Sequence, residues 1–213
     1  VRAACKSCCA MGRAWNPIFF YYLFTSMLNH EVRFRFLPMS YIYEPTKNDK
    51  VVELPDFVQS SVGAPNPHVL SNEGKLNLFY YAQESDPDWD GTSVRIVGPE
   101  TEGETVAIVH FEGVMAHYFG PPNDEAFEGH PLRKRGLLPY SQCEIQDSTW
   151  LSNFEKLNRV HTSHKASLFD GYRHFIFVFH DSIFECIAKT AKTRSHLGSI
   201  RSAISEVLRS EDR

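Results

Sequence analysis

The residues of this chain best suited to chemistry are its histidines and the carboxylates that follow them. Ten histidines are present, and seven of them lie between positions 110 and 180. His161 and His164 are two residues apart, and His180, Asp181 and Glu185 follow. Zinc and iron accept imidazole nitrogens and carboxylate oxygens as ligands. The pattern suggests a divalent metal site at His161, His164 and His180, although it matches no strict zinc motif and each imidazole could instead be structural.

Acid–base catalysis is a second possibility at the same segment. His180 stands beside Asp181, which could orient its imidazole, and Glu185 offers another carboxylate nearby. Ser182 or Cys186 could supply a nucleophile. However, the chain lacks a Gly-x-Ser-x-Gly motif, and Asp181 and Ser182 also suit a simple turn or helix cap. We therefore take His180, Asp181 and Glu185 as catalytic candidates without assigning a reaction.

Ligand binding is the third possibility, and it depends on one long expected strand. His110 and Glu112 fall on one face of this strand and His117 falls on the other, but a bulge at Gly113 would bring the three together. Together with aromatic residues such as Trp150, they could line a largely apolar pocket for a small molecule. The same side chains could equally complete an ordinary core.

The elements that must position these residues follow from periodicity and turn signals. Strands are predicted over 76–83, 93–97, 105–119, 141–146 and 175–179, and helices are predicted to begin at 147–148 and at Ser199. The run from Phe175 to Phe179 is rich in aromatic and β-branched residues, as expected of a buried strand. Most strand connections are short, which favours an α+β domain with a mainly antiparallel sheet and helices packed on one face.

The segment after Asp181 fits two structures. Ser182 and Glu185 have the spacing of a capping box, which would begin a helix. The residues from Ile183 to Ile187 also alternate like the returning strand of a hairpin. We favour the hairpin, because β-branched and aromatic residues dominate this segment.

The beginning of the chain differs from the remainder. Residues 1–38 hold three of the five cysteines and an aromatic run without helical or strand periodicity. The run is shorter than the roughly 20 apolar residues that a membrane-spanning helix needs, and no small-x-small cleavage site follows it. We expect 1–38 to be an extension, explained by a start codon assigned too early before Met39 or by a short signal or anchor. A single α+β domain is expected over 39–213.

Composition narrows the possible partners. The formal net charge of -4 and a pI near 6.2 argue against nucleic acid and against an anionic membrane surface, since neither is attracted by an acidic protein. The one basic cluster, Arg133 to Arg135, suits a solvated loop better than a phosphate site. Cys143 and Cys186 stand alone in the body of the chain, which favours small buried thiols and a cytoplasmic location.

Several blocks in the second half of the chain are similar to segments of an uncharacterised bacterial protein family. The blocks are Gly129-His130-Pro131-Leu132-x-x-Arg135-Gly136-Leu137, Asp147-Ser148-x-Trp150-Leu151, Asn158-Arg159-Val160-His161 and Phe179-His180-Asp181-Ser182-x-Phe184-Glu185-Cys186-Ile187-Ala188. The resemblance spans the region after Leu76. It implies no activity, cofactor or site residue.

Taken together, the sequence predicts a soluble protein that binds a small molecule or a protein partner. The alternative is a metal-dependent hydrolase that uses His161, His164 and His180 with Asp181 or Glu185. Whether the protein is an enzyme is left open by the sequence.

Overall fold

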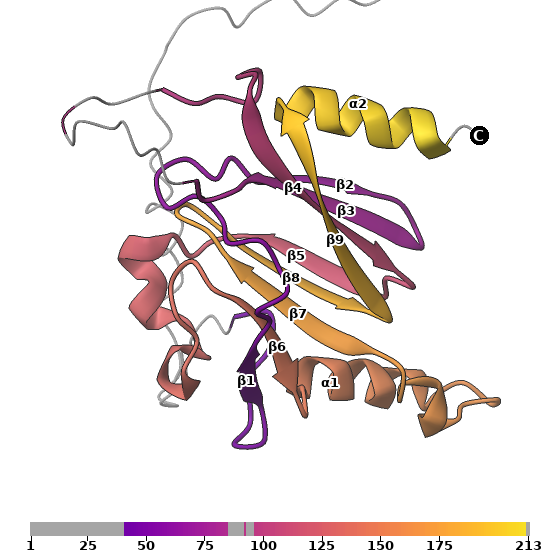
Figure 1. The fold of residues 1–213 in the computed structure, drawn as a ribbon. Coiled ribbons are helices and arrows are strands. Elements are labelled where there is room, and N and C mark those ends of the chain that lie inside the picture. The colour runs from indigo at the N-terminus through magenta and orange to yellow at the C-terminus, as the bar shows by residue number, and fades with distance from the viewer. Residues whose placement is uncertain (1–40, 85–91, 93–95, 212–213) are drawn as a thin grey trace, which may run out of the picture. The chain divides into compact units, whose positions relative to one another are not determined.

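The computed structural model describes residues 41–84, 92 and 96–211. The predicted extension over 1–38 and most of the strand predicted over 93–97 lie outside these residues. Strand segments and helices of the described residues are labelled in Figure 1.

Five strands form one antiparallel sheet in the order β1-β6-β7-β8-β5. These strands are β1 (Lys50–Glu53), β5 (Ala116–Gly120), β6 (Gln142–Gln146), β7 (Arg173–Val178) and β8 (Ile183–Ala188). β7 and β8 are joined by the hairpin predicted after Asp181, so the hairpin prediction is confirmed. Its register pairs Val178 with Ile183 and Ile176 with Glu185.

Four strands form a second antiparallel sheet in the order β2-β3-β4-β9. They are β2 (His68–Ser71), β3 (Lys75–Tyr81), β4 (Glu104–Glu112) and β9 (Thr190–Gly198). β9 follows β8 after one residue, Lys189, yet it belongs to the other sheet. The sequence did not predict β9, because its alternation is polar on both sides.

The two sheets enclose the main core. Apolar side chains of β3 and β4 meet those of β7 and β8, including Leu78, Phe111 and Phe177, which are fully buried. The opposite face of each sheet is also covered, since α1 (Thr149–Asn158) packs on the five-stranded sheet and α2 (Ile200–Glu211) packs on the four-stranded one (Figure 1). The inner strands are therefore buried on both faces, which explains their nearly continuous apolar runs. The predicted α+β class with mainly antiparallel sheets is confirmed.

The prediction of one long strand over 105–119 is wrong. The segment is broken at Gly113 into β4 and β5, which pair in different sheets. Gly113 has a φ of 63°, in the left-handed region that glycine enters without steric cost. The predicted bend at this glycine is present, but it moves the chain from one sheet to the other.

Helix ends follow local signals. Ser148 accepts a hydrogen bond from the backbone N–H of Leu151 and so caps α1, as predicted. Ser199 accepts one from the N–H of Ser202 at the start of α2. Short 3₁₀ segments cover Asp124–Gly129, Arg133–Arg135 and Ala166–Leu168. In the part of the chain that the structure describes, no helix has the length and apolar character needed to cross a bilayer.

Candidate functional site

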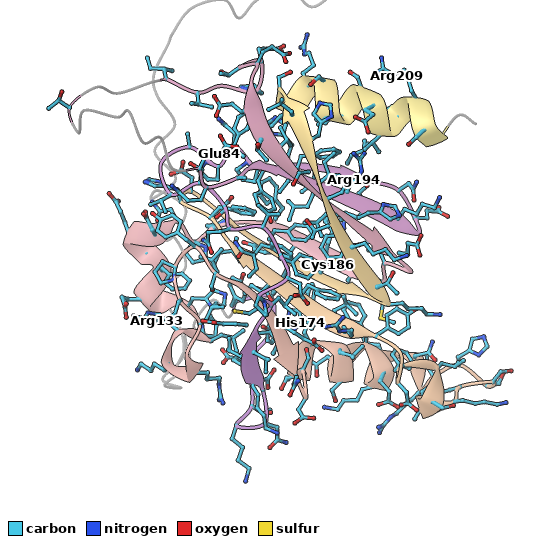
Figure 2. The ribbon with its side chains drawn as sticks, viewed as in Figure 1. Glu84, Arg133, His174, Cys186, Arg194 and Arg209 are labelled. Atoms are coloured by element: carbon cyan, nitrogen blue, oxygen red, sulfur yellow. The ribbon has the colours of Figure 1, made fainter. Side chains whose placement is uncertain are left out.

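An unusual feature of the described residues is a carboxylate buried in the apolar layer between the five-stranded sheet and α1. Glu185 lies on β8 with its side chain fully buried, among the apolar residues that α1 and the preceding loops cover. His174 lies on β7 (Figure 2). It is two residues from the position opposite Glu185 and on the same face of the sheet. Such diagonal neighbours of a hairpin are close enough for long side chains to interact.

Glu185 is surrounded by two phenols and two imidazoles from three segments of the chain. Its Oε2 atom accepts a bond from the Tyr43 hydroxyl at 3.1 Å and lies 2.7 Å from His174 Nε2. Its Oε1 atom lies 3.7 Å from His130 Nε2. The Tyr41 ring packs edge-on against His130, with 4.6 Å between ring centroids, and its hydroxyl is buried beside the same carboxyl. These side chains form an anion-binding site, and the anion in it is the Glu185 carboxylate itself.

This environment determines the ionisation of Glu185. Burial alone opposes ionisation, but the imidazoles of His130 and His174 outweigh it and lower the pKa of the carboxyl to about 2. Burial and the negative charge of Glu185 raise the pKa of both Tyr41 and Tyr43, so their hydroxyls keep the protons that face the carboxylate. Glu185 is therefore an ionised group inside the protein.

The hydrogen bonds also orient both imidazoles. The Nδ1 atom of His130 accepts the backbone N–H of Leu132 at 3.2 Å, so its proton lies on Nε2, toward Glu185. His174 directs Nε2 at the ionised carboxylate, which requires a proton on that nitrogen. Its Nδ1 atom lies 2.8 Å from the Ser148 hydroxyl oxygen. A chain of hydrogen bonds thus runs from Ser148 through His174 to Glu185.

Ser148 and His174 are held in place by the start of α1. Ser148 follows β6 and Asp147, whose φ of 54° turns the chain sharply from strand to helix. Trp150 stacks on the Tyr43 ring, with 5.8 Å between centroids, and meets the His174 ring edge-on at 5.1 Å. These aromatic contacts leave the imidazole little freedom to rotate.

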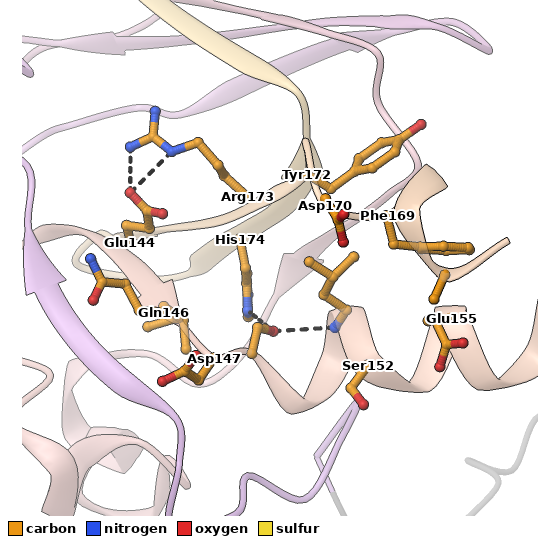
Figure 3. A pocket seen from close by; sticks show the side chains of 14 residues that line it. Glu144, Gln146, Asp147, Ser152, Glu155, Phe169, Asp170, Tyr172, Arg173 and His174 are labelled. Atoms are coloured by element: carbon orange, nitrogen blue, oxygen red, sulfur yellow. Dashed lines mark hydrogen bonds and ion pairs between the residues drawn. The ribbon is translucent and has the colours of Figure 1, made fainter.

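A cavity of about 660 Å³ lies between β6, β7, α1 and the 166–173 loop (Figure 3). Ser148 and His174 are both part of its wall. Leu151, Phe169 and Tyr172 supply apolar surface, and the acidic side chains of the wall are Glu144, Asp147, Glu155 and Asp170. The volume lies within the range of small-molecule sites.

The cavity wall carries more negative than positive charge. Arg173 is its one arginine or lysine, and it is paired with Glu144. Asp147 is paired with Lys50 at 3.1 Å, and Glu155 binds Arg159 at 2.7 Å. Among the described residues, Asp170 has no ion-pair partner. A positively charged group in the cavity would find an unneutralised carboxylate there.

The structure does not bring the predicted metal ligands together. His164 contacts Glu155 at 3.0 Å, and His161 accepts the N–H of Ser163. His180 instead lies 3.6 Å from Asp124. Within the described residues, no group of three or more histidine, cysteine, aspartate or glutamate side chains is arranged to hold a metal ion.

The predicted catalytic residues also separate. His180 and Asp181 are in contact at 2.9 Å on the surface, and this hydrogen bond raises the pKa of His180. Glu185 points to the buried face and takes its partners from other segments. The three residues are close in sequence, but His180 and Asp181 lie in the turn between β7 and β8, whereas Glu185 lies within β8.

The predicted ligand-binding residues lie in different parts of the fold. His110 contacts Glu112 at 3.5 Å on the four-stranded sheet, whereas His117 stacks on Phe184 in the other sheet. Burial lowers the pKa of His117. Trp150 is buried against Tyr43 and His174, so it alone of the four contacts the buried polar network.

The sequence missed the residues that complete this network. The roles of Ser148, His130 and Tyr43 depend on contacts between segments 26 to 142 positions apart, for which local patterns carry no signal. The hairpin register was the one available clue, since a turn at Asp181 and Ser182 places His174 diagonal to Glu185.

Comparison of the chain with protein-family models, with curated proteins and with solved structures found no match. The resemblance to an uncharacterised bacterial family stays a prediction.

Proposed function

We propose that this protein binds a small organic cation with an apolar body in the cavity between β6, β7, α1 and the 166–173 loop. The observation that carries the proposal is the cavity itself, about 660 Å³ in volume, with apolar side chains and an excess of carboxylates in its wall. Small-molecule sites typically combine a mainly apolar wall with a few polar groups that orient the ligand.

The two kinds of wall residue suggest how the ligand is oriented. Phe169 and Tyr172 supply aromatic surface, which attracts both apolar groups and cations, and the Lys189 ammonium lies over the Tyr172 ring at 5.4 Å. Asp170 supplies a carboxylate without an ion-pair partner among the described residues. An ammonium group would therefore lie near Asp170, with the apolar part of the ligand against Leu151 and the rings.

Benzylamine, benzyl alcohol and benzoate provide a direct test, because they share one ring and differ in charge. We expect benzylamine to bind most tightly and benzoate least, as measured by isothermal titration calorimetry and by chemical-shift changes of residues in the cavity wall. Asp170→Asn should weaken benzylamine binding about fivefold, corresponding to the roughly 1 kcal/mol of an exposed charge pair.

Asp56→Asn is the matched control for this measurement. It removes one negative charge at an exposed position outside the cavity wall and should leave benzylamine binding unchanged. Equal affinity for the three compounds, or equal loss in the two variants, would contradict the charge preference. Absence of binding by all three would contradict the proposal.

A further inference from the structure

We propose that Ser148 is a nucleophile that accepts an acyl group from an ester bound in the cavity, with His174 as its base and Glu185 as the positioning residue. The inference rests on the proposed function, because the cavity must hold the ester. The inference goes beyond ligand binding, because it assigns a chemical reaction to the same cavity.

The geometry is that of a serine–histidine–carboxylate relay. Ser148 Oγ lies 2.8 Å from His174 Nδ1, and His174 Nε2 lies 2.7 Å from Glu185 Oε2. A nucleophile and base within hydrogen-bond distance, with a third group orienting the base, are the structural marks of nucleophilic catalysis. The imidazole uses Nδ1 for the serine and Nε2 for the carboxylate. Such relays are recognised by their geometry and roles, not by sequence motifs.

The position of Ser148 favours reaction at its oxygen. Ser148 follows the sharp turn at Asp147 and stands at the first turn of α1, where the helix dipole favours negative charge. The backbone N–H of Leu151 donates to Oγ at 3.2 Å and so fixes the position of this oxygen. Ser148 and His174 both belong to the cavity wall, where Ser148 is buried with 7% of its surface exposed.

A purely structural role does not account for the whole arrangement. Capping α1 requires only that Ser148 Oγ accept an N–H, and Ser199 does the same for α2 without an imidazole. A fully buried ionised carboxylate costs several kcal/mol unless its surroundings compensate. The chain provides Glu185 with two imidazoles and two phenols, and only one of these imidazoles continues to a hydroxyl that reaches a cavity.

The reaction balances with water as the second substrate. Ser148 Oγ forms a bond to the ester carbonyl carbon while its proton passes to His174 Nδ1, and the charge of the resulting imidazolium is balanced by Glu185. The carbon–oxygen bond to the alcohol then breaks, and the alcohol leaves with the proton from His174. Water attacks the acyl group with His174 as base. The products are a carboxylic acid, an alcohol and the original Ser148 hydroxyl.

A fluorophosphonate reagent tests the nucleophile on the full-length protein. Ser148 Oγ displaces fluoride from phosphorus, with His174 taking the hydroxyl proton. We expect intact-mass spectrometry to show one adduct, and peptide mapping to locate it at Ser148. The protein should also hydrolyse p-nitrophenyl acetate, and the modified protein should not.

Two matched variants separate reaction from capping. Ser148→Asn keeps a side chain that caps helices well but removes the nucleophile, so it should abolish both labelling and hydrolysis. Ser199→Asn makes the same change at the cap of α2 and should retain both. Labelling at another residue, or equal labelling of Ser148→Asn and the wild type, would overturn the assignment.

Glu185→Gln tests the positioning role. We expect this variant to change only one of the two kinetic constants of labelling. The maximal labelling rate should fall about 100-fold, whereas the fluorophosphonate concentration that gives half of this rate should be unchanged. A merely structural role for Glu185 would leave the maximal rate of the folded variant at the wild-type value. Circular dichroism and benzylamine binding confirm that the variant is folded with its cavity intact.

The outcomes distinguish this inference from the proposed function. Benzylamine binding without reaction at Ser148 would overturn the nucleophile and leave the binding function standing. Reaction at Ser148 without benzylamine binding would support the nucleophile and refute the cation site. Protection of Ser148 from labelling by benzylamine would support both.

Discussion

At the scale of single residues, the buried Glu185 is the feature that sequence reasoning interpreted least well. The chain order placed it with His180 and Asp181, which lie at the surface. Strand alternation turns Glu185 inward, toward His174 on the neighbouring strand. The alternation of β8 was visible in the sequence, but the partners from distant loops were not, because loop positions depend on the completed fold.

The buried carboxylate predicts an acid-dependent loss of stability. Its pKa is lowered from the ordinary value of 4.5 to about 2, so the unfolded chain binds a proton at a higher pH than the folded protein does. The stabilisation is present above pH 4.5 and is lost as the pH falls toward 2, by up to about 3 kcal/mol. Urea denaturation of the wild type at pH 6 and pH 3, compared with Glu185→Gln, measures this contribution.

Glu185→Gln should be less stable than the wild type at pH 6, and the difference should shrink at pH 3. Glu73→Gln, at an exposed position, should follow the wild type at both values. A constant difference between Glu185→Gln and the wild type would mean that the Glu185 carboxyl has the same pKa in the folded and unfolded states.

At the scale of elements, local signals predicted most boundaries. The caps of both helices and the hairpin between β7 and β8 follow from residue types near each end. The transfer of the chain from β4 to β5 did not follow, because a glycine inside an apolar run indicates a bend but not the sheet to which the next strand belongs. β9 lacked an apolar face, since it forms an edge.

Substitution of Gly113 by alanine should destabilise the protein in two ways, through the backbone conformation and through a steric contact. Alanine there would be forced into a left-handed conformation at φ 63°, and its Cβ would lie 2.9 Å from Lys189 Cγ. Gly103→Ala has a similar φ of 81° but no heavy atom within 4 Å of the new Cβ. We expect Gly103→Ala to lower the free energy of unfolding by about 1–2 kcal/mol and Gly113→Ala to lower it further. Equal losses in urea denaturation would show that Lys189 moves aside freely.

At the scale of the whole domain, the apolar strand content predicted the core but not its division into two sheets. The sequence suggested one sheet with its helices, whereas β3 and β4 pack face to face with β7 and β8. The aromatic run of β7 is explained by this packing, since its residues alternate between the inter-sheet core and the layer beneath α1. Periodicity cannot reveal which sheet covers a doubly buried strand.

Phe177 joins the two sheets and provides a test of this core. Its ring is fully buried and contacts Tyr80, Phe111 and Phe184 at centroid distances of 6.0 to 6.3 Å. Phe177→Ala should lower the free energy of unfolding by about 3–5 kcal/mol, as measured by urea denaturation. Leu197→Ala, at a side chain 75% exposed, should change it by less than about 0.5 kcal/mol. Similar losses in both variants would contradict the packing described.

The one-residue connection between β8 and β9 affects how the domain unfolds. Lys189 leaves no slack between the last strand of one sheet and the edge strand of the other, and its N–H is bonded to the carbonyl of Glu112 where β4 ends. Neither sheet can therefore unfold by itself without breaking strand–strand hydrogen bonds in the other sheet. The two sheets should melt together as one cooperative unit, and the Ser148 relay should persist until that global transition.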